Sequence, residues 1–281
     1  MNNTKYLHLL LVSLSVAPTT LTTTINLGNA ICQRVTGGQV VSEGKYPWFA
    51  RYSIKGAQDA LKPGPYGAGM LIDKYWVLTA AHVVMELHGT PGLVGQFTFG
   101  LYDLNKPNNS YVSEIDEIFL HPLYSSGADM ALVKLKKPVL HIKPISIANH
   151  NQIPVIGSMA TTIGFGISGV DKNENDIIYP TQMQEAQIPI VNKNWIKENN
   201  AEKLFLGIFN DKFDLLAGST SGVRQAAALG DSGGPLIQNI DGQETLIGVV
   251  KSGPYEWTKP SPTCFSSVYK QYSWINEIIK K

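Results

Sequence analysis

The residues most able to do chemistry in this chain lie in the segment Gly230-Asp231-Ser232-Gly233-Gly234-Pro235-Leu236. It places one serine hydroxyl between glycines, in a turn whose backbone can approach a substrate carbonyl closely. A serine hydroxyl barely ionises at neutral pH, so it becomes a nucleophile only when a nearby base takes its proton. A serine in a Gly-rich turn is by itself more often structural than catalytic, so the segment is informative only together with such a base.

Two upstream segments supply the partners of such a nucleophile. His82 ends the run Leu78-Thr79-Ala80-Ala81-His82, and Asp129 begins the run Asp129-Met130-Ala131-Leu132-Val133-Lys134-Leu135. An imidazole can take the serine proton during attack and return one to the leaving amine. A carboxylate can fix the tautomer of that imidazole and stabilise its charged form. The chain has six histidines, and His82 is the one with this context.

The order His82, Asp129, Ser232 along the chain resembles that of the trypsin/chymotrypsin family of serine proteases. The subtilisins and the α/β-hydrolases order the same three residue types differently. The resemblance covers essentially the whole chain from Arg34 onward. It implies that the three residues form a catalytic triad, and that the backbone N–H groups of Gly230 and Ser232 form the oxyanion hole.

The resemblance implies a secreted serine endopeptidase that cleaves protein or peptide substrates through an acyl-enzyme. The alternative is a catalytically impaired homologue that binds partners through the same scaffold, and Lys251 favours it. Most relatives have a serine supporting the triad aspartate at this position, after two aliphatic residues that correspond to Val249 and Val250. Either the register slips by one residue and places Ser252 there, or Lys251 points away.

A second informative segment is Arg34-Val35-Thr36-Gly37-Gly38, which resembles the activation junction of the family. Cleavage after Arg34 by an activating protease would free the ammonium group of Val35. This ammonium could pair with Asp231, whose burial without a cation would be costly. The resemblance therefore implies a zymogen. The alternative is an ordinary Gly-Gly turn.

The resemblance also indicates which side chains select the substrate. Ala226 should form the base of the primary specificity pocket, and Gly253 and Ser267 should line its walls. An uncharged base cannot offset the desolvation of a substrate cation, so we expect a chymotrypsin- or elastase-like preference. Glu256 could also reach this pocket.

The chain contains two cysteines, Cys32 and Cys264. An even count in a secreted protein makes a single Cys32–Cys264 disulfide plausible, and two unpaired thiols are the alternative. The family usually has a further bridge beside the catalytic histidine. The matching positions are Gly67 and Val83, so both halves of that bridge are absent together.

Short apolar or alternating runs, such as residues 69–72 and 76–79, are separated by Gly- and Pro-rich turns and predict an all-β fold. Together with the resemblance, they predict two six-stranded antiparallel Greek-key barrels, over about residues 45–140 and 155–270, followed by a short C-terminal helix. Helical patterns appear over residues 194–206 and 272–280, the second with Trp274 and Ile275 facing inward.

The N-terminal residues 1–30 read as a secretory signal peptide, with an apolar stretch and a small-residue end at Ala30. A short buried strand or helix is the alternative. Residues 31–34 would then be a propeptide and residues 35–281 a protease domain. The net charge of +1 gives no indication of nucleic-acid binding, and no later segment suggests a membrane anchor. We expect a monomer without a cofactor. We also expect no metal site, because Leu101 stands where the first acidic ligand of the calcium loop of some relatives would be.

Overall fold

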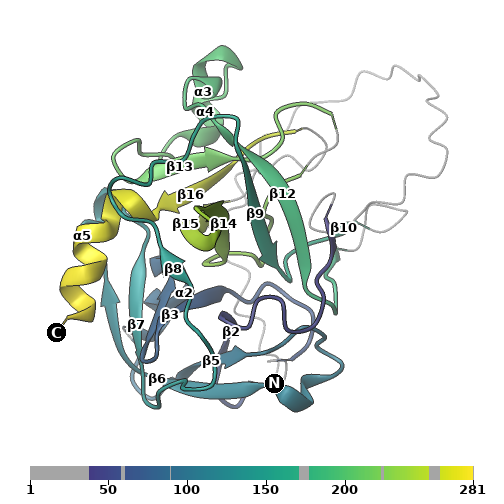
Figure 1. The fold of residues 1–281 in the computed structure, drawn as a ribbon, viewed down its shortest axis with the longest axis vertical. Coiled ribbons are helices and arrows are strands. Elements are labelled where there is room, and N and C mark those ends of the chain that lie inside the picture. The colour runs from purple at the N-terminus through teal and green to yellow at the C-terminus, as the bar shows by residue number, and fades with distance from the viewer. Residues whose placement is uncertain are drawn as a thin grey trace, which may run out of the picture. The chain divides into compact units, whose positions relative to one another are not determined.

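The computed structural model describes residues 38–57, 61–88, 90–170, 177–222, 225–252 and 260–280 (Figure 1). The predicted signal peptide and propeptide lie outside these residues, as do Cys32, Arg34, Val35 and Gly253. Within the described part of the chain, no helix is long and apolar enough to cross a membrane.

The first barrel is a closed ring of six antiparallel strands in the order β2-β3-β4-β7-β6-β5. The strands are β2 (Phe49–Ile54), β3 (Ala68–Asp73), β4 (Trp76–Thr79), β5 (Gly95–Phe99), β6 (Tyr111–Leu120) and β7 (Ala131–Leu135). Large side chains such as Phe97, Phe99 and Met70 fill its interior and are fully buried. The alternation of side chains along each strand directs one set inward, and this set forms the core of the barrel.

The second barrel repeats this connectivity. Its strands are β9 (Met159–Gly164), β12 (Gln184–Val191), β13 (Asp214–Ala217), β14 (Pro235–Ile240), β15 (Gln243–Ser252) and β16 (Thr263–Ser267). They close in the order β9-β12-β13-β16-β15-β14, because β14 pairs with β9. Numbered within each barrel, both rings follow the order 1-2-3-6-5-4. The predicted pair of six-stranded antiparallel barrels is confirmed, and Figure 1 shows the first barrel below the second.

In the described part of the chain, four short strands lie outside the two rings. β1 (Gln39–Val40) pairs with β12, and β8 (Ser146–Ile147) runs parallel to β15. β10 (Gly169–Val170) and β11 (Ile177–Ile178) form a separate two-stranded ribbon. The parallel β8 comes from the Pro-containing connection between the barrels, so this connection packs onto the second barrel.

The described helices are α2 (Ala81–His88), α3 (Trp195–Glu198), α4 (Glu202–Phe205) and α5 (Val268–Ile279), with 3₁₀ turns η1 (Pro107–Asn109) and η2 (Tyr124–Ser126). The single helix predicted over residues 194–206 is two short helices, because Asn200 takes a left-handed conformation with φ of 52° between them. The C-terminal helix begins four residues before its predicted start. Ile275 is buried as expected, whereas Trp274 is only partly buried, against the ring of His121.

Candidate active site

The first barrel brings His82 and Asp129 together. β4 ends at Thr79, and α2 begins at Ala81, so His82 lies in the first turn of the helix. Asp129 precedes β7, which pairs with β4 so that Ala131 lies opposite Thr79. His82 Nδ1 lies 2.6 Å from Asp129 Oδ2, and the His82 backbone N–H donates to Asp129 Oδ1 at 2.9 Å.

Burial makes this pair suited to acid–base chemistry. The Asp129 side chain is 9% exposed, whereas that of His82 is 34% exposed. Two hydrogen bonds from one residue fix the carboxylate in place. Since Nδ1 of His82 is hydrogen-bonded to Asp129, Nε2 is the ring nitrogen left to exchange a proton with another group.

The Ser232 segment packs against the strands that lead into His82. The Ser232 carbonyl accepts the Ala68 N–H of β3 at 2.8 Å. The Ala68 carbonyl in turn accepts the Thr79 hydroxyl of β4 at 2.6 Å. A Cβ on Gly233 would overlap both the Ala68 carbonyl and the Thr79 hydroxyl, so a larger residue could not make this approach. The Ser232 segment of the second barrel is thus bonded to β3 of the first barrel, and β3 is bonded in turn to Thr79, three residues before the predicted base.

The two positions of the missing family bridge also meet beside this contact. A Cβ built on Gly67 would overlap Cγ1 of Val83, and would lie 3.2 Å from the carbonyl of Ser232. Val83 directly follows His82 in α2. A branched aliphatic side chain against a glycine therefore occupies the space between these two positions.

Asp231 is buried in a cradle of two glycines. Its carboxylate accepts the N–H of Gly166 at 2.8 Å and of Ala228 at 2.9 Å. A Cβ on either Gly164 or Gly166 would overlap the carboxylate. Burial raises the pKa of Asp231 to about 6, and among the described residues no cation pairs with it. A positive charge placed beside this buried carboxylate would strongly stabilise its ionised form.

Gly230 takes the left-handed conformation, with φ of +98°. A Cβ there would lie 3.1 Å from Cα of Gly166 and 3.3 Å from the Tyr179 ring. Both the backbone angle and the close contacts therefore require glycine at this position. The predicted oxyanion donors, the N–H groups of Gly230 and Ser232, flank Asp231 in this turn.

The specificity region requires a correction. Ala226 is buried, and Thr263 lies beside it, because the Thr263 hydroxyl donates to the Ala227 carbonyl at 3.3 Å. Ser267, predicted as a pocket wall, lies at the other end of β16, opposite Gly248. Four strand residues span about 13 Å, too far to line one small pocket with Ala226. Thr263, four residues before Ser267 on β16, is the residue of this strand that contacts the segment containing Ala226.

Lys251 lies at a bulge in the pairing of β15 with β16. Val250 pairs with Phe265, but Ser252 pairs with Cys264, so Lys251 has no partner on β16. Its ammonium donates to Asp214 Oδ2 at 2.7 Å and to the Gly127 carbonyl at 2.9 Å. The Lys251 ammonium therefore bonds both the second barrel and the turn that precedes Asp129. Sequence reasoning missed Asp214, because nothing local to it indicates a partner.

The predicted disulfide is not formed in this structure. Cys264 has a free thiol and is buried, and its Sγ lies 3.8 Å from the Ile208 carbonyl. It packs in a small apolar cluster with Ile196, Ala201, Phe205 and Leu216. Burial raises the pKa of the Cys264 thiol, which keeps it protonated and unreactive.

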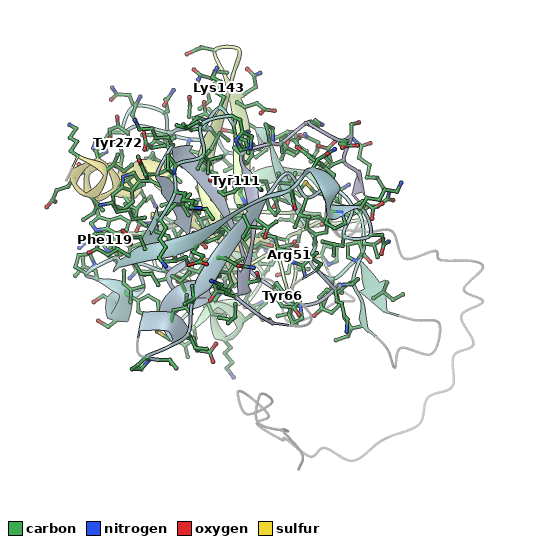
Figure 2. The ribbon with its side chains drawn as sticks, turned by 90° about the horizontal axis from the view of Figure 1, so that it is seen from below. Arg51, Tyr66, Tyr111, Phe119, Lys143 and Tyr272 are labelled. Carbon is green, nitrogen blue, oxygen red and sulfur yellow. The ribbon has the colours of Figure 1, made fainter. Side chains whose placement is uncertain are left out.

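Sequence reasoning also missed Arg51, a buried cation in β2. Its guanidinium lies over the ring of Tyr66 at 4.5 Å and near that of Phe165 at 5.6 Å; Figure 2 labels Arg51 and Tyr66 side by side. One nitrogen donates to the Lys62 carbonyl at 2.5 Å, whereas Nε and Nη1 are buried and have no hydrogen-bond partner among the described residues. Burial lowers the pKa of Arg51 to about 10. Phe165 separates the two glycines of the Asp231 cradle, so this cation belongs to the same region.

Two closed six-stranded antiparallel barrels followed by a short C-terminal helix are the fold of a trypsin-like protein. A family model described as Trypsin matches residues 35–275, which is most of the chain. The chain therefore belongs to the trypsin family.

Proposed function

We propose that this chain is a serine endopeptidase in which Ser232 is the nucleophile, His82 the general base and Asp129 the residue that orients His82. The observation that carries the proposal is the His82–Asp129 pair, bonded at 2.6 Å and set against the Ser232 segment. His82 would take the Ser232 proton as the hydroxyl attacks the peptide carbonyl, and would then return it to the leaving amine. Water would hydrolyse the resulting acyl-enzyme by the same route.

The turn before the nucleophile would stabilise the negative charge that develops on the carbonyl oxygen. We assign this role to the backbone N–H groups of Gly230 and Ser232. Removing one donor of this kind costs about 2.7–4 kcal/mol in subtilisin, where it has been measured. The left-handed backbone of Gly230 supports the assignment, because it frees the turn from the strain that a side chain would add.

We further propose that the protease is secreted as a zymogen with the signal peptide 1–30 and the propeptide 31–34. Cleavage after Arg34 would release the ammonium of Val35, which would pair with Asp231. The support for this pairing is the buried Asp231 carboxylate, whose raised pKa of about 6 reflects burial without a cation among the described residues. An activating protease with a preference for basic residues is therefore an expected partner.

Labelling with a fluorophosphonate tests the proposed chemistry. Protein cleaved after Arg34 should form one covalent adduct, located at Ser232 by peptide mass spectrometry, and Ser232→Ala should form none. A folded, cleaved wild-type protein that stays unlabelled would support the catalytically impaired homologue instead. Lys251, the feature that favours this alternative, donates to Asp214 and to the Gly127 carbonyl and not to the Asp129 carboxylate.

The primary specificity would be for small or medium apolar side chains. We assign the base of the pocket to Ala226, which is uncharged and buried, and its wall to Thr263, whose hydroxyl donates to the adjacent Ala227 carbonyl. A library of peptides should be cut after Ala, Val, Leu or Met in preference to Arg or Lys. Ala226→Asp should move the preference toward Arg and Lys by about tenfold or more. Preferred cleavage after Arg or Lys by the wild type would contradict the pocket assignment and direct attention to Glu256.

A further inference from the structure

The turn that precedes Asp129 is held by side chains from the second barrel. Lys251 donates to the Gly127 carbonyl at 2.9 Å, and this same carbonyl accepts the N–H of Asp129 at 3.1 Å. The amide of Asn210 donates to the neighbouring carbonyl of Ser126 at 2.9 Å. The backbone around the predicted triad aspartate is thus fixed from outside its own barrel.

A buried carboxylate organises both of these donors. Asp214 Oδ2 accepts the Lys251 ammonium at 2.7 Å and the Asn210 backbone N–H at 2.8 Å. The side chains of Lys251 and Asp214 are 8% and 0% exposed. Burial raises the pKa of Asp214, and the charge of Lys251 is the largest influence in the opposite direction. The two charges therefore depend on one another inside the protein.

The same end of β15 also fixes the Ser232 segment. The N–H of Gly233, next to Ser232, donates to the Val250 carbonyl at 2.9 Å, and Lys251 is the next residue. One strand end thus holds the nucleophile segment through its backbone and the Asp129 turn through a side chain. β16 supplies a third contact that holds the same region, since the Ser266 hydroxyl donates to the Asp129 carbonyl at 2.8 Å.

We propose that Lys251 and Asp214 are positioning residues for the triad, which set Asp129 relative to Ser232 across the two barrels. This inference rests on the proposed function. A buried ion pair is a poor source of stability, because an apolar pair of similar size often serves as well. The fixed directions of its hydrogen bonds are what an apolar pair cannot supply. A small misplacement of a catalytic group can cost about a hundredfold in rate.

The experiment distinguishes an effect on the position of Asp129 from an effect on the stability of the fold. Lys251→Met leaves the Asp214 charge buried without its partner, so loss of folding in this variant would have a simple explanation. The double variant Lys251→Met, Asp214→Leu removes both charges and should melt close to the wild type. Its kcat on a peptide substrate should fall about ten- to a hundredfold, while KM should stay within about twofold. Lys251→Arg, which keeps the cation, should recover most of the kcat.

Two further variants keep the test decisive. Asn210→Ala leaves the Lys251–Asp214 pair intact but removes the hydrogen bond to the Ser126 carbonyl. It should lower kcat less than the double variant does and leave KM unchanged. This variant can be measured even if the double variant folds poorly. Lys193→Met breaks the exposed Lys193–Asp211 ion pair on the same barrel and should change neither constant. A double variant that is stable and has wild-type kcat would overturn the proposal, as would an unchanged kcat in Asn210→Ala.

A spectroscopic reading distinguishes this proposal from the proposed function. The short His82–Asp129 hydrogen bond should give a proton resonance far downfield, assigned by its loss in Asp129→Asn. In the double variant at position 251 and 214 this resonance should weaken or move upfield, whether or not the protein is active. If the cleaved wild type is not labelled by fluorophosphonate, the proposed function fails. A resonance that is the same in the double variant as in the wild type refutes the positioning role, whatever the outcome of the labelling.

Discussion

The two barrels hold their parts of the candidate site by different means. In the first barrel, His82 and Asp129 bond directly to one another, so the folded chain completes this pair. In the second barrel, Ser232 follows Asp231, whose buried carboxylate bonds only backbone N–H groups among the described residues. The half of the candidate site that contains the proposed nucleophile therefore carries a charge that folding of the described residues does not balance.

A second carboxylate in the same barrel shows that this is not a general property of its interior. Asp214 is as deeply buried as Asp231, yet it has the ammonium of Lys251 at 2.7 Å. One buried charge is balanced by the described fold and the other is not. This contrast suggests a permanent structural role for Asp214 and a regulated role for Asp231, and it predicts different responses to mutation.

The largest expected effect follows from withholding the proposed cation from Asp231. Arg34→Gln should prevent cleavage and leave the carboxylate without the ammonium of Val35. An uncompensated buried charge of this kind costs about 3–5 kcal/mol, which corresponds to roughly two to three and a half orders of magnitude in activity. We expect peptide hydrolysis to fall by this factor after treatment with a trypsin-like activator.

The control for this variant is a wild-type sample treated in the same way, with cleavage verified by N-terminal sequencing. Full activity in uncleaved Arg34→Gln would show that Asp231 needs no added cation, and the contrast between Asp231 and Asp214 would have no functional meaning.

A somewhat smaller effect concerns the stability of the uncleaved protein. The pKa of Asp231 is raised from 3.8 to about 6 by burial, so the folded state holds the proton more tightly than the unfolded state does. The contribution of the group is therefore favourable below pH 3.8, and it is lost as the pH rises through 6. The loss amounts to about 3 kcal/mol in the free energy of unfolding.

Urea unfolding of the uncleaved wild type and of Asp231→Asn between pH 4 and 7 measures this difference. The wild type should lose stability relative to the variant as the pH rises. Asp241→Asn, an exposed carboxylate in a turn, is the matched control and should follow the wild type. Parallel curves for Asp231→Asn and the wild type would mean that Asp231 already has a cation.

The smallest expected effect concerns the first barrel, where the charged groups of the candidate site already bond one another. Gly67→Cys with Val83→Cys should form a disulfide, because a Cβ at position 67 already meets the Val83 side chain. A closed loop of this length stabilises by at most about 3 kcal/mol, and engineered bridges usually give less. Activity should be retained.

Thiol titration and melting temperatures with and without reductant measure the effect of the bridge. A bridge that forms but abolishes fluorophosphonate labelling would show that the first barrel must move during catalysis, since position 67 also lies beside the Ser232 carbonyl.

Much of the fold could be predicted from local patterns. The runs at Gly69–Ile72 and Trp76–Thr79 correspond to β3 and β4, because alternation and β-branched residues act over a few positions. The start of α5 was wrong by four residues, since Val268 and Gln271 extend its buried face toward β16 and the predicted helical pattern began at Tyr272. Helix boundaries depend on packing that a single sequence does not show.

The candidate site divides in the same way. Its proposed chemistry was visible in three short motifs, and the structure brings two of them into direct contact, whereas the roles of all three remain predictions. The assignment of Ser267 was wrong because the position of a pocket wall depends on strand register. The segment between Ser252 and Thr263 gives no local signal that fixes this register.

The sequence by itself therefore determined the residue types of the candidate site and the two-barrel architecture. Only the tertiary structure decided which buried charges meet: Lys251 with Asp214, and Asp231 with the backbone of Gly166, 65 residues away. A single-residue bulge at Lys251 shifts its side chain relative to the regular strand pairing. Partnerships between distant residues depend on such shifts, because side chains on a strand alternate with a period of two and no local preference records the shift.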